Sequence, residues 1–353
     1  MKLLPVTPDS IKMGAQILRN GGLVAFPTET VYGLGADAYN PRALAKVFEA
    51  KKRPFFDPLI IHIAEINTLE KITNLRLLNN EIQKKLFILA ENLWPGPFSV
   101  ILPKNDKIPG IAAAGLQTIA VRFPDHDAAQ KLISLSSGAV AAPSANPFGS
   151  LSPTRAEHVR DSLGDKVDMI LDGGPARIGI ESTVLEITGD CFRILRPGGT
   201  PKEAIDRLVG FTEEPGTQAR ESEKKKQLEE NVNERFASPG QLKSHYAPKK
   251  PLFVLSREEI ISLPYEEDSA FLFFDGSSRD VWHKEHAPPR GAVVKALSES
   301  GDMQEAASHF FETLHELDNS GVSKIYAQPA PQYGLGEAIN DRLKRGSEGN
   351  KNI

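Results

Sequence analysis

The stretch Ala142-Pro143-Ser144-Ala145-Asn146-Pro147 presents a hydroxyl, an amide and backbone N–H groups directly after a run of small apolar residues. Ser152-Pro153-Thr154 adds further hydroxyls a few residues later, and Lys51-Lys52-Arg53-Pro54 gathers cations upstream. Lys supplies a compact charge and Arg a planar fork for anionic oxygen atoms. If the fold brings these stretches together, they form a concave anion site suited to a nucleotide.

Familiar nucleotide-binding and hydrolase motifs are missing from the sequence. It contains no Gly-x-x-x-x-Gly-Lys-Ser/Thr loop, no Gly-x-Gly-x-x-Gly after an apolar strand, no His-Glu-x-x-His helix and no Gly-x-Ser-x-Gly elbow. A triphosphate would therefore be held by a different construction.

Other polar residues admit both a structural and a functional interpretation. His62 lies within an apolar run, where a lone histidine is more often a core residue than a ligand. Thr30 fits a simple turn equally well. Arg122 ends the apolar run Ile119-Ala120-Val121, and a buried charge there needs a partner, most naturally a carboxylate. Ser182, just before a strand, could be only a cap or a turn residue, and Arg196, beside a glycine turn, is compatible with either phosphate or solvent.

An alternation of short apolar runs with helix-like stretches predicts an α/β domain. The predicted strands cover residues 23–26, 59–63, 98–102, 119–123, 140–142, 169–171, 184–187 and 192–195. The predicted helices cover 10–19, 41–49, 79–92, 155–162 and 202–208. Residues 27–35 are predicted to be a turn whose glycines allow close backbone approach. Because ligands of open α/β sheets bind at strand ends, we expect Arg53, Arg122, Ser144 and Arg196 to converge on one hollow there.

Composition changes after the first two hundred residues and divides the chain. Residues 1–211 are predicted to be the larger catalytic domain, 212–249 a charged linker with a lid-like segment at 238–248, 250–346 a small α/β domain, and 347–353 a tail. In the small domain, strands are predicted at 252–255, 270–274 and 324–327, with a helix near 303–317.

The overall composition is that of an ordinary globular protein. The chain has 353 residues, 40% hydrophobic and 25% charged, with a net charge of −4 that argues against a broadly basic nucleic-acid binder. Cys191 is the single cysteine, so the chain forms no internal disulfide and no cysteine-based zinc site. We see no signal peptide and no membrane span, and expect a cytoplasmic location.

In their order, these motifs resemble the threonylcarbamoyl-AMP synthase family, the YrdC-like domain in its long, two-domain form. The resemblance covers nearly the whole chain. It rests on Pro27–Gly35, Lys51–Pro54, Pro58–His62, Trp94–Pro97, Val121-Arg122, Pro143–Asn146, Ser152–Thr154, Gly179–Thr183, Leu195–Gly198, Ser238–Gly240, His245–Pro248 and Gly334–Arg342. It implies an open, twisted YrdC-like α/β catalytic domain followed by a smaller Rossmann-like α/β domain.

The resemblance also implies an activity and a set of site residues. The family makes threonylcarbamoyl-AMP and pyrophosphate from L-threonine, bicarbonate and ATP, and passes the product to the machinery that forms threonylcarbamoyladenosine in tRNA. By motif, L-threonine is expected at Thr30, His62, Arg122, Ala142 and Ser182. ATP is expected at Arg53, Asp57, Thr118, Ser144, Ser152, Arg196 and His245. Lys51, Arg53 and Asn146 are expected to be catalytic, with Mg²⁺ arriving on ATP and no dedicated protein metal site.

Two positions depart from the family pattern. Asp57 stands where many relatives have Asn, so that it either contacts ATP through the metal or points away from it. Ser244 replaces an arginine common in relatives, which puts one phosphate contact in doubt.

Two other functions remain open at the level of sequence. One is a double-stranded RNA or tRNA-binding module that uses the same basic cleft, and a weak RNA contact is compatible with the enzyme as well. The other is the related carbamoyl transfer of hydrogenase maturation proteins, whose accessory zinc and acylphosphatase-like modules the chain lacks. Pyrophosphate release that needs threonine and bicarbonate together separates these alternatives.

Overall fold

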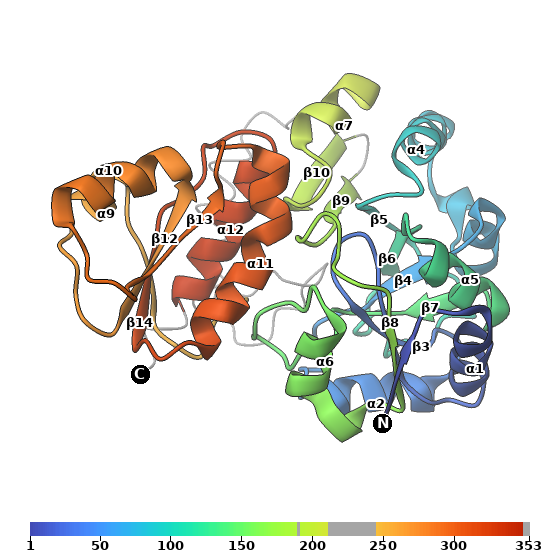
Figure 1. Ribbon diagram of the computed structural model, residues 1–353. Helices are drawn as coiled ribbons and strands as arrows, with labels where there is room; N and C mark the ends of the chain where they lie inside the picture. The colour runs from blue at the N-terminus through green and yellow to red at the C-terminus, as the bar shows by residue number, and fades with distance from the viewer. Residues whose placement is uncertain (189–190, 211–244, 349–353) are drawn as a thin grey trace.

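A ten-stranded mixed sheet forms the centre of the larger domain. The computed structural model describes residues 1–188, 191–210 and 245–348 (Figure 1). The strand order is β1-β8-β2-β3-β7-β4-β6-β5-β9-β10. The strands are β1 (Lys2–Pro5), β2 (Val24–Phe26), β3 (Gly33–Asp37), β4 (Ile60–Ile63), β5 (Phe98–Pro103), β6 (Thr118–Arg122), β7 (Ala139–Ala141), β8 (Met169–Asp172), β9 (Thr183–Thr188) and β10 (Cys191–Arg196).

Helices cover both faces of this sheet. They are α1 (Pro8–Arg19), α2 (Pro41–Lys51), α3 (Leu69–Ile72), α4 (Asn80–Leu93), α5 (Asp127–Leu135), α6 (Ala156–Leu163) and α7 (Lys202–Val209). One apolar cluster joins α2, α4 and α6 to the sheet, and another joins α1 and α5 to it. Single 3₁₀ turns occur at Ile66–Thr68, Leu75–Leu77 and Gly164–Lys166.

Strand alternation separates the core from the side chains that carry charge. In β4, Ile61 and Ile63 belong to the larger core cluster, and in β6 Ile119 and Val121 do so. Successive strand residues point to opposite faces, so His62 and Arg122 share the other face. The two are also register partners on the parallel strands β4 and β6. The alternation of these apolar runs therefore places a histidine beside an arginine.

The segment predicted as a turn at residues 27–35 is a turn only in part. Residues 33–37 form β3, which pairs antiparallel with β2 and β7 in the middle of the sheet. A Cβ on Gly35 would lie 2.9 Å from the Phe26 ring, so glycine here admits a close neighbour within a strand. The prediction of an uninterrupted turn was wrong because pairing on both sides outweighs the local preference of glycine.

The smaller domain is a parallel four-stranded sheet in the order β11-β14-β12-β13. Its elements are β11 (Leu252–Val254), α9 (Arg257–Ser262), β12 (Ser269–Asp275), α10 (Gly276–His286), β13 (Val293–Ser298), α11 (Met303–Asn319), β14 (Lys324–Ala327) and α12 (Leu335–Glu348). Phe271 and Phe273 pack with α9 and α10, whereas Ala270 and Leu272 pack with α11 and α12. Helices thus cover both faces, as expected for a Rossmann-like fold. α12 runs to Glu348, past the predicted end at residue 346.

The two sheets are joined through α11 and α12, which lie between the small sheet and the larger domain (Figure 1). Val31, Leu151 and Ile180 of the larger domain belong to the same apolar cluster as residues of these helices. The contact is close at Gly179, where a Cβ would lie 2.5 Å from the carbonyl oxygen of Ala307 on α11. The small domain is therefore packed against the catalytic one.

Candidate functional site

A pocket lies where the ends of β4, β6 and β10 meet the start of β9. It gathers side chains from segments far apart in the sequence. Among the residues predicted as ligands, those that line it are Arg53, His62, Arg122, Ala142, Ser144, Ser182, Arg196 and His245. The four residues expected to converge, Arg53, Arg122, Ser144 and Arg196, are all in this group. The structure thus brings the predicted anion-binding residues together in one hollow.

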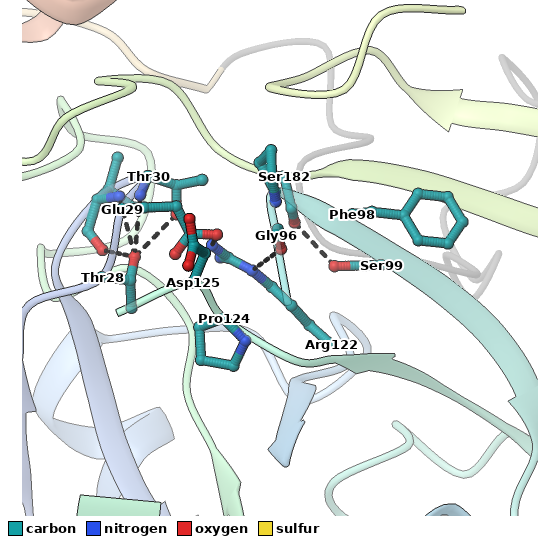
Figure 2. A network of polar contacts seen from close by, with 12 residues as sticks. Thr28, Glu29, Thr30, Gly96, Phe98, Ser99, Arg122, Pro124, Asp125 and Ser182 are labelled. Carbon is teal, nitrogen blue, oxygen red and sulfur yellow. Dashed lines mark hydrogen bonds and ion pairs between the residues drawn. The ribbon is translucent and has the colours of Figure 1, made fainter. Parts of the chain in front are cut away.

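Arg122 has the carboxylate partner that its buried position demands. Its Nη2 lies 2.7 Å from Oε1 of Glu29, and both side chains are buried. Its Nε donates weakly to the carbonyl oxygen of Gly96 at 3.4 Å. Figure 2 shows Glu29 and Gly96 on either side of the Arg122 guanidinium. The guanidinium is therefore held in place and charge-compensated by groups of the protein itself.

Hydroxyl pairs surround this ion pair. Thr28 Oγ1 donates to the carbonyl oxygen of Val31 and lies 2.9 Å from Thr30 Oγ1. On the other side, Ser99 Oγ lies 2.8 Å from Ser182 Oγ (Figure 2). Thr30 is buried behind Thr28, which lines the pocket in its place. The Thr28 and Ser182 hydroxyls are thus fixed beside Arg122.

His62 is neutral in this environment. Burial, reinforced by the nearby Arg122 guanidinium, lowers the pKa of His62 to about 3, although a contact with the Ile60 carbonyl oxygen opposes the fall. That contact joins Nδ1 to the carbonyl oxygen at 3.2 Å, which makes Nδ1 the protonated nitrogen. His62 therefore presents an uncharged imidazole to the pocket at neutral pH.

Arg53 and Arg196 supply the cations on the other side of the pocket. The end of α2 directs Arg53 inward, because Lys52 adopts a left-handed conformation with φ of 53°. Arg53 Nη2 lies 2.9 Å from Asp57 Oδ2, and Nε donates to the Asp57 carbonyl oxygen at 3.0 Å. Arg196 donates to the Ser182 carbonyl oxygen at 2.9 Å and to its hydroxyl at 3.2 Å. Both guanidinium groups are therefore preset by acceptors at fixed positions.

Asp57 is a counter-ion of Arg53 and is not among the residues that line the pocket. Burial raises the pKa of Asp57, while the Arg53 guanidinium opposes that rise. The sequence left open whether Asp57 contacts ATP through the metal or points away from it. In the structure the Asp57 carboxylate is directed at Arg53. Ser244, the second departure, lies outside the described residues.

Lys51 and Asn146 support the loop that carries Ser144. The Nζ of Lys51 donates to the carbonyl oxygen of Ser144 at 2.6 Å and also to that of Asn146. Asn146 Nδ2 donates to the carbonyl oxygen of Ser150 at 2.8 Å, while its Oδ1 is buried without a hydrogen-bond partner among the described residues. Burial, with Arg53 close by, lowers the pKa of Lys51 well below its ordinary value. Both residues lie behind the pocket wall in this arrangement.

His245 and Tyr246 bring the segment before the small domain into the pocket wall. The His245 ring contacts Phe148 edge-on at 5.5 Å and Tyr246 at 4.1 Å between centroids. Burial, together with Arg53 and other nearby cations, lowers the pKa of His245 well below its ordinary value. Its Nδ1 has no hydrogen-bond partner among the described residues. The first part of the predicted lid-like segment, residues 238–244, lies outside those residues.

Besides Asp57, two predicted ATP contacts lie away from the pocket lining, Ser152 and Thr118. Ser152 is buried, and its hydroxyl donates to Oε1 of Glu181, which lines the pocket. Thr118 begins β6, so that it stands about 13 Å along the strand from Arg122. Their roles toward ATP stay predictions from the resemblance.

Sequence reasoning missed Glu29, Glu181, Tyr246 and Arg342 as parts of the site. Glu29 had a signal, because the buried charge of Arg122 required a carboxylate and Glu29 stands between two threonines of the quoted motif. Arg342 forms an ion pair with Glu181 at 3.0 Å across 161 residues of sequence, which no local pattern reveals.

The described residues contain no group of three or more His, Cys, Asp or Glu side chains arranged to hold a metal ion. Within the same residues, no helix is both long and apolar enough to cross a bilayer.

Comparison with known proteins assigns the chain to a family. A family profile described as "Telomere recombination" matches residues 16–198, and one described as "Threonylcarbamoyl-AMP synthase, C-terminal domain" matches residues 201–347. A threonylcarbamoyl-AMP synthase of Pyrococcus abyssi is 38% identical, with 96% of this chain and 94% of the relative covered. That of Bacillus subtilis is 39% identical, with 98% and 95% covered. The chain belongs to the threonylcarbamoyl-AMP synthase family.

A solved structure of this threonylcarbamoyl-AMP synthase family has the same fold. The crystal structure of P. abyssi Sua5 complexed with L-threonine is 34% identical, covers 98% of this chain with 96% of its own length, and gives a TM-score of 0.80. The two family profiles divide the chain between residues 198 and 201, before α7, whereas composition placed the division at residue 211. α7 thus falls within the range of the second profile.

Proposed function

We propose that this chain is an L-threonylcarbamoyladenylate synthase, a nucleotidyltransferase that makes threonylcarbamoyl-AMP for tRNA modification. The substrates are L-threonine, bicarbonate and ATP, and the products are threonylcarbamoyl-AMP, pyrophosphate and water. The observation that carries the proposal is that Arg122, Arg53 and Arg196, from three separate segments, line a single pocket. Family membership and the two-domain match support the same activity.

Arg122 suits the carboxylate of an amino acid. Its guanidinium offers a planar fork, and Glu29 fixes the direction of that fork by occupying Nη2. The Thr28 and Ser182 hydroxyls lie nearby to orient the rest of the molecule. Neutral His62 adds no second positive charge, so the amine of threonine is not repelled beside it.

Arg53, Arg196 and the Ser144 loop suit the phosphates of ATP. ATP carries about four negative charges, which require cations and donors around the leaving pyrophosphate. Mg²⁺ would arrive on the phosphates, where it commonly keeps several waters and few protein ligands. We assign Lys51 and Asn146 to holding the Ser144 loop, and their expected catalytic role stays a prediction from the resemblance.

The reaction joins the two halves of the pocket. The threonine nitrogen lone pair forms a bond to the carbon derived from bicarbonate, with loss of water, and gives a carbamate. A carbamate oxygen then bonds to the α-phosphorus while the bond to the pyrophosphate oxygen breaks. Positioning and charge stabilisation dominate such phosphoryl chemistry. A carbamate hydrolyses in water, so His245 and Tyr246 would help to exclude solvent as parts of the wall.

The decisive experiment measures pyrophosphate release by the full-length protein with MgATP, L-threonine and bicarbonate. We expect release only when all three are present, together with a product whose mass equals threonylcarbamoyl-AMP. Glu312→Gln, which removes a surface ion pair with Arg155 far from Arg122, is the matched active control.

Release without threonine or without bicarbonate contradicts the proposal. Binding of double-stranded RNA or tRNA without any release would instead favour the binding module. A synthase of this kind would pass its product to the tRNA threonylcarbamoyl-transferase machinery. We place the synthase in the cytoplasm.

A further inference from the structure

One fully buried arginine of the small domain lies directly behind residues of the pocket wall. Arg342 lies on α12, one of the two helices between the small sheet and the catalytic domain (Figure 1). It is 1% exposed, although it belongs to a helix at the end of the chain. Arginine is seldom buried to this extent unless its charge is paired.

Arg342 contacts three separate segments, and each of them carries a residue of the pocket. Its Nε donates to Oε2 of Glu181 at 3.0 Å, and its Nη1 donates to the carbonyl oxygen of Pro197, directly after Arg196. Its guanidinium carbon lies 5.1 Å from the centre of the Tyr246 ring. Glu181, Arg196 and Tyr246 all line the pocket, whereas Arg342 itself stands behind them.

The contacts of Arg342 extend to the predicted ATP ligands. Glu181 accepts from Arg342 through Oε2 and from the Ser152 hydroxyl through Oε1. Burial favours the neutral form of the Glu181 carboxyl, but Arg342 and Arg196 outweigh it and lower the pKa of Glu181 below its ordinary value. The glutamate is therefore ionised, and its two oxygens hold two different segments in a fixed relation.

We propose that Arg342 is a positioning residue of the ATP half of the pocket, by which the small domain sets Glu181, the Arg196–Pro197 turn and Tyr246 in the arrangement that binds the nucleotide. This inference rests on the proposed synthase activity. It gives the small domain a part in the reaction, although the reacting groups come from the larger domain.

The test uses Arg342→Met and Arg342→Lys in the full-length protein, with KM measured separately for ATP and for threonine. For Arg342→Met we expect the KM for ATP to rise roughly tenfold or more, about 1.4 kcal/mol, with the KM for threonine changed less than about twofold. Arg342→Lys should fall between Met and wild type, because it restores the charge without the fork.

Two further variants separate a positioning role of Arg342 from a general weakening of the contact between the two domains. Glu312→Gln removes a different ion pair between the small domain and the catalytic domain, that of Glu312 on α11 with Arg155 at 2.6 Å, and should leave the KM for ATP unchanged. Glu181→Gln combined with Arg342→Met removes both buried charges, so the melting temperature should recover relative to Arg342→Met alone. The KM for ATP should nevertheless stay raised, because the carbonyl oxygen of Pro197 still lacks its donor from Arg342.

Three outcomes would overturn the inference: an unchanged KM for ATP in Arg342→Met, an equal rise of both KM values, or recovery of the KM for ATP together with the melting temperature in the double variant. Failure of the proposed synthase function is seen separately, since wild-type protein would then release no pyrophosphate in the same assay.

Discussion

The neutral state of His62 predicts how the stability of the protein responds to acid. The imidazole is buried between the sheet and the pocket, next to Arg122. Burial and then the Arg122 charge lower the pKa of His62 from 6.5 to about 3. The folded state therefore binds a proton on His62 much less readily than the unfolded chain does.

The sign and size of the effect follow from this difference in pKa. Above pH 6.5 the imidazole is neutral in both states, so it makes no pH-dependent contribution. Between pH 6.5 and about 3 the unfolded chain is protonated and the folded protein is not, so stability falls as pH falls. From pH 7.5 to pH 5 the loss amounts to about 2 kcal/mol, because it approaches roughly 1.4 kcal/mol for each pH unit below 6.5.

The measurement compares urea unfolding of wild type and His62→Asn at pH 7.5 and pH 5. Asparagine can keep a donor toward the Ile60 carbonyl oxygen but has no group that titrates in this range. We expect the wild type to lose about 2 kcal/mol more than the variant between these pH values. Other histidines contribute equally to both proteins and cancel in the comparison.

Equal pH dependence in wild type and His62→Asn would refute the reasoning, because His62 would then titrate alike in the folded and unfolded states.

Two other variants test the same site. Arg122→Met leaves the Glu29 carboxylate buried without its counter-ion, so it should cost about 3–5 kcal/mol of unfolding free energy. Calorimetry should show threonine binding lost and ATP binding kept, and retention of threonine binding would contradict the role of Arg122. Gly198→Ala should cost roughly 1–3 kcal/mol and slow pyrophosphate release, because the new Cβ would lie 2.4 Å from the carbonyl oxygen of Glu181. Urea unfolding measures the loss of stability, and the release assay measures the slower reaction. Wild-type values in both would contradict the prediction, because the turn would then accommodate a Cβ at residue 198.

Apolar runs predicted most strands of the large sheet, because those strands are buried and their side chains come from a narrow set. β3 was missed because its glycines resemble a turn, whereas its place between β2 and β7 depends on partners distant in sequence. β13 was missed for another reason. Its residues are mostly half-buried at the edge of the small sheet, so no apolar run marks it. Local sequence is informative where burial is complete and weak where pairing alone fixes the strand.

The sequence predicts a site residue where the residue type itself requires a partner, as a buried charge does. Arg122 at the end of a buried strand requires an anion, and both Glu29 and the expected carboxylate of threonine answer that requirement. The residues behind the wall were not predictable in this way. Arg342 lies on the apolar face of α12, at helical spacing from Ala338 and Ile339, but the sequence does not reveal Glu181 as its partner 161 residues away.

A pocket for ATP needs cations, yet buried cations without partners would destabilise the empty protein. This chain meets both requirements by giving each guanidinium an acceptor that does not line the pocket or is part of the backbone: Glu29 for Arg122, Asp57 for Arg53, and the Ser182 carbonyl oxygen for Arg196. The acceptors fix the direction of each fork, so that a ligand would meet donors already in place and lose less affinity to ordering them. The same pairing explains why a chain with a net charge of −4 can hold a cationic hollow. The positive charges gather at strand ends in one pocket, and the counter-ions of Arg122 and Arg53 are buried behind its lining.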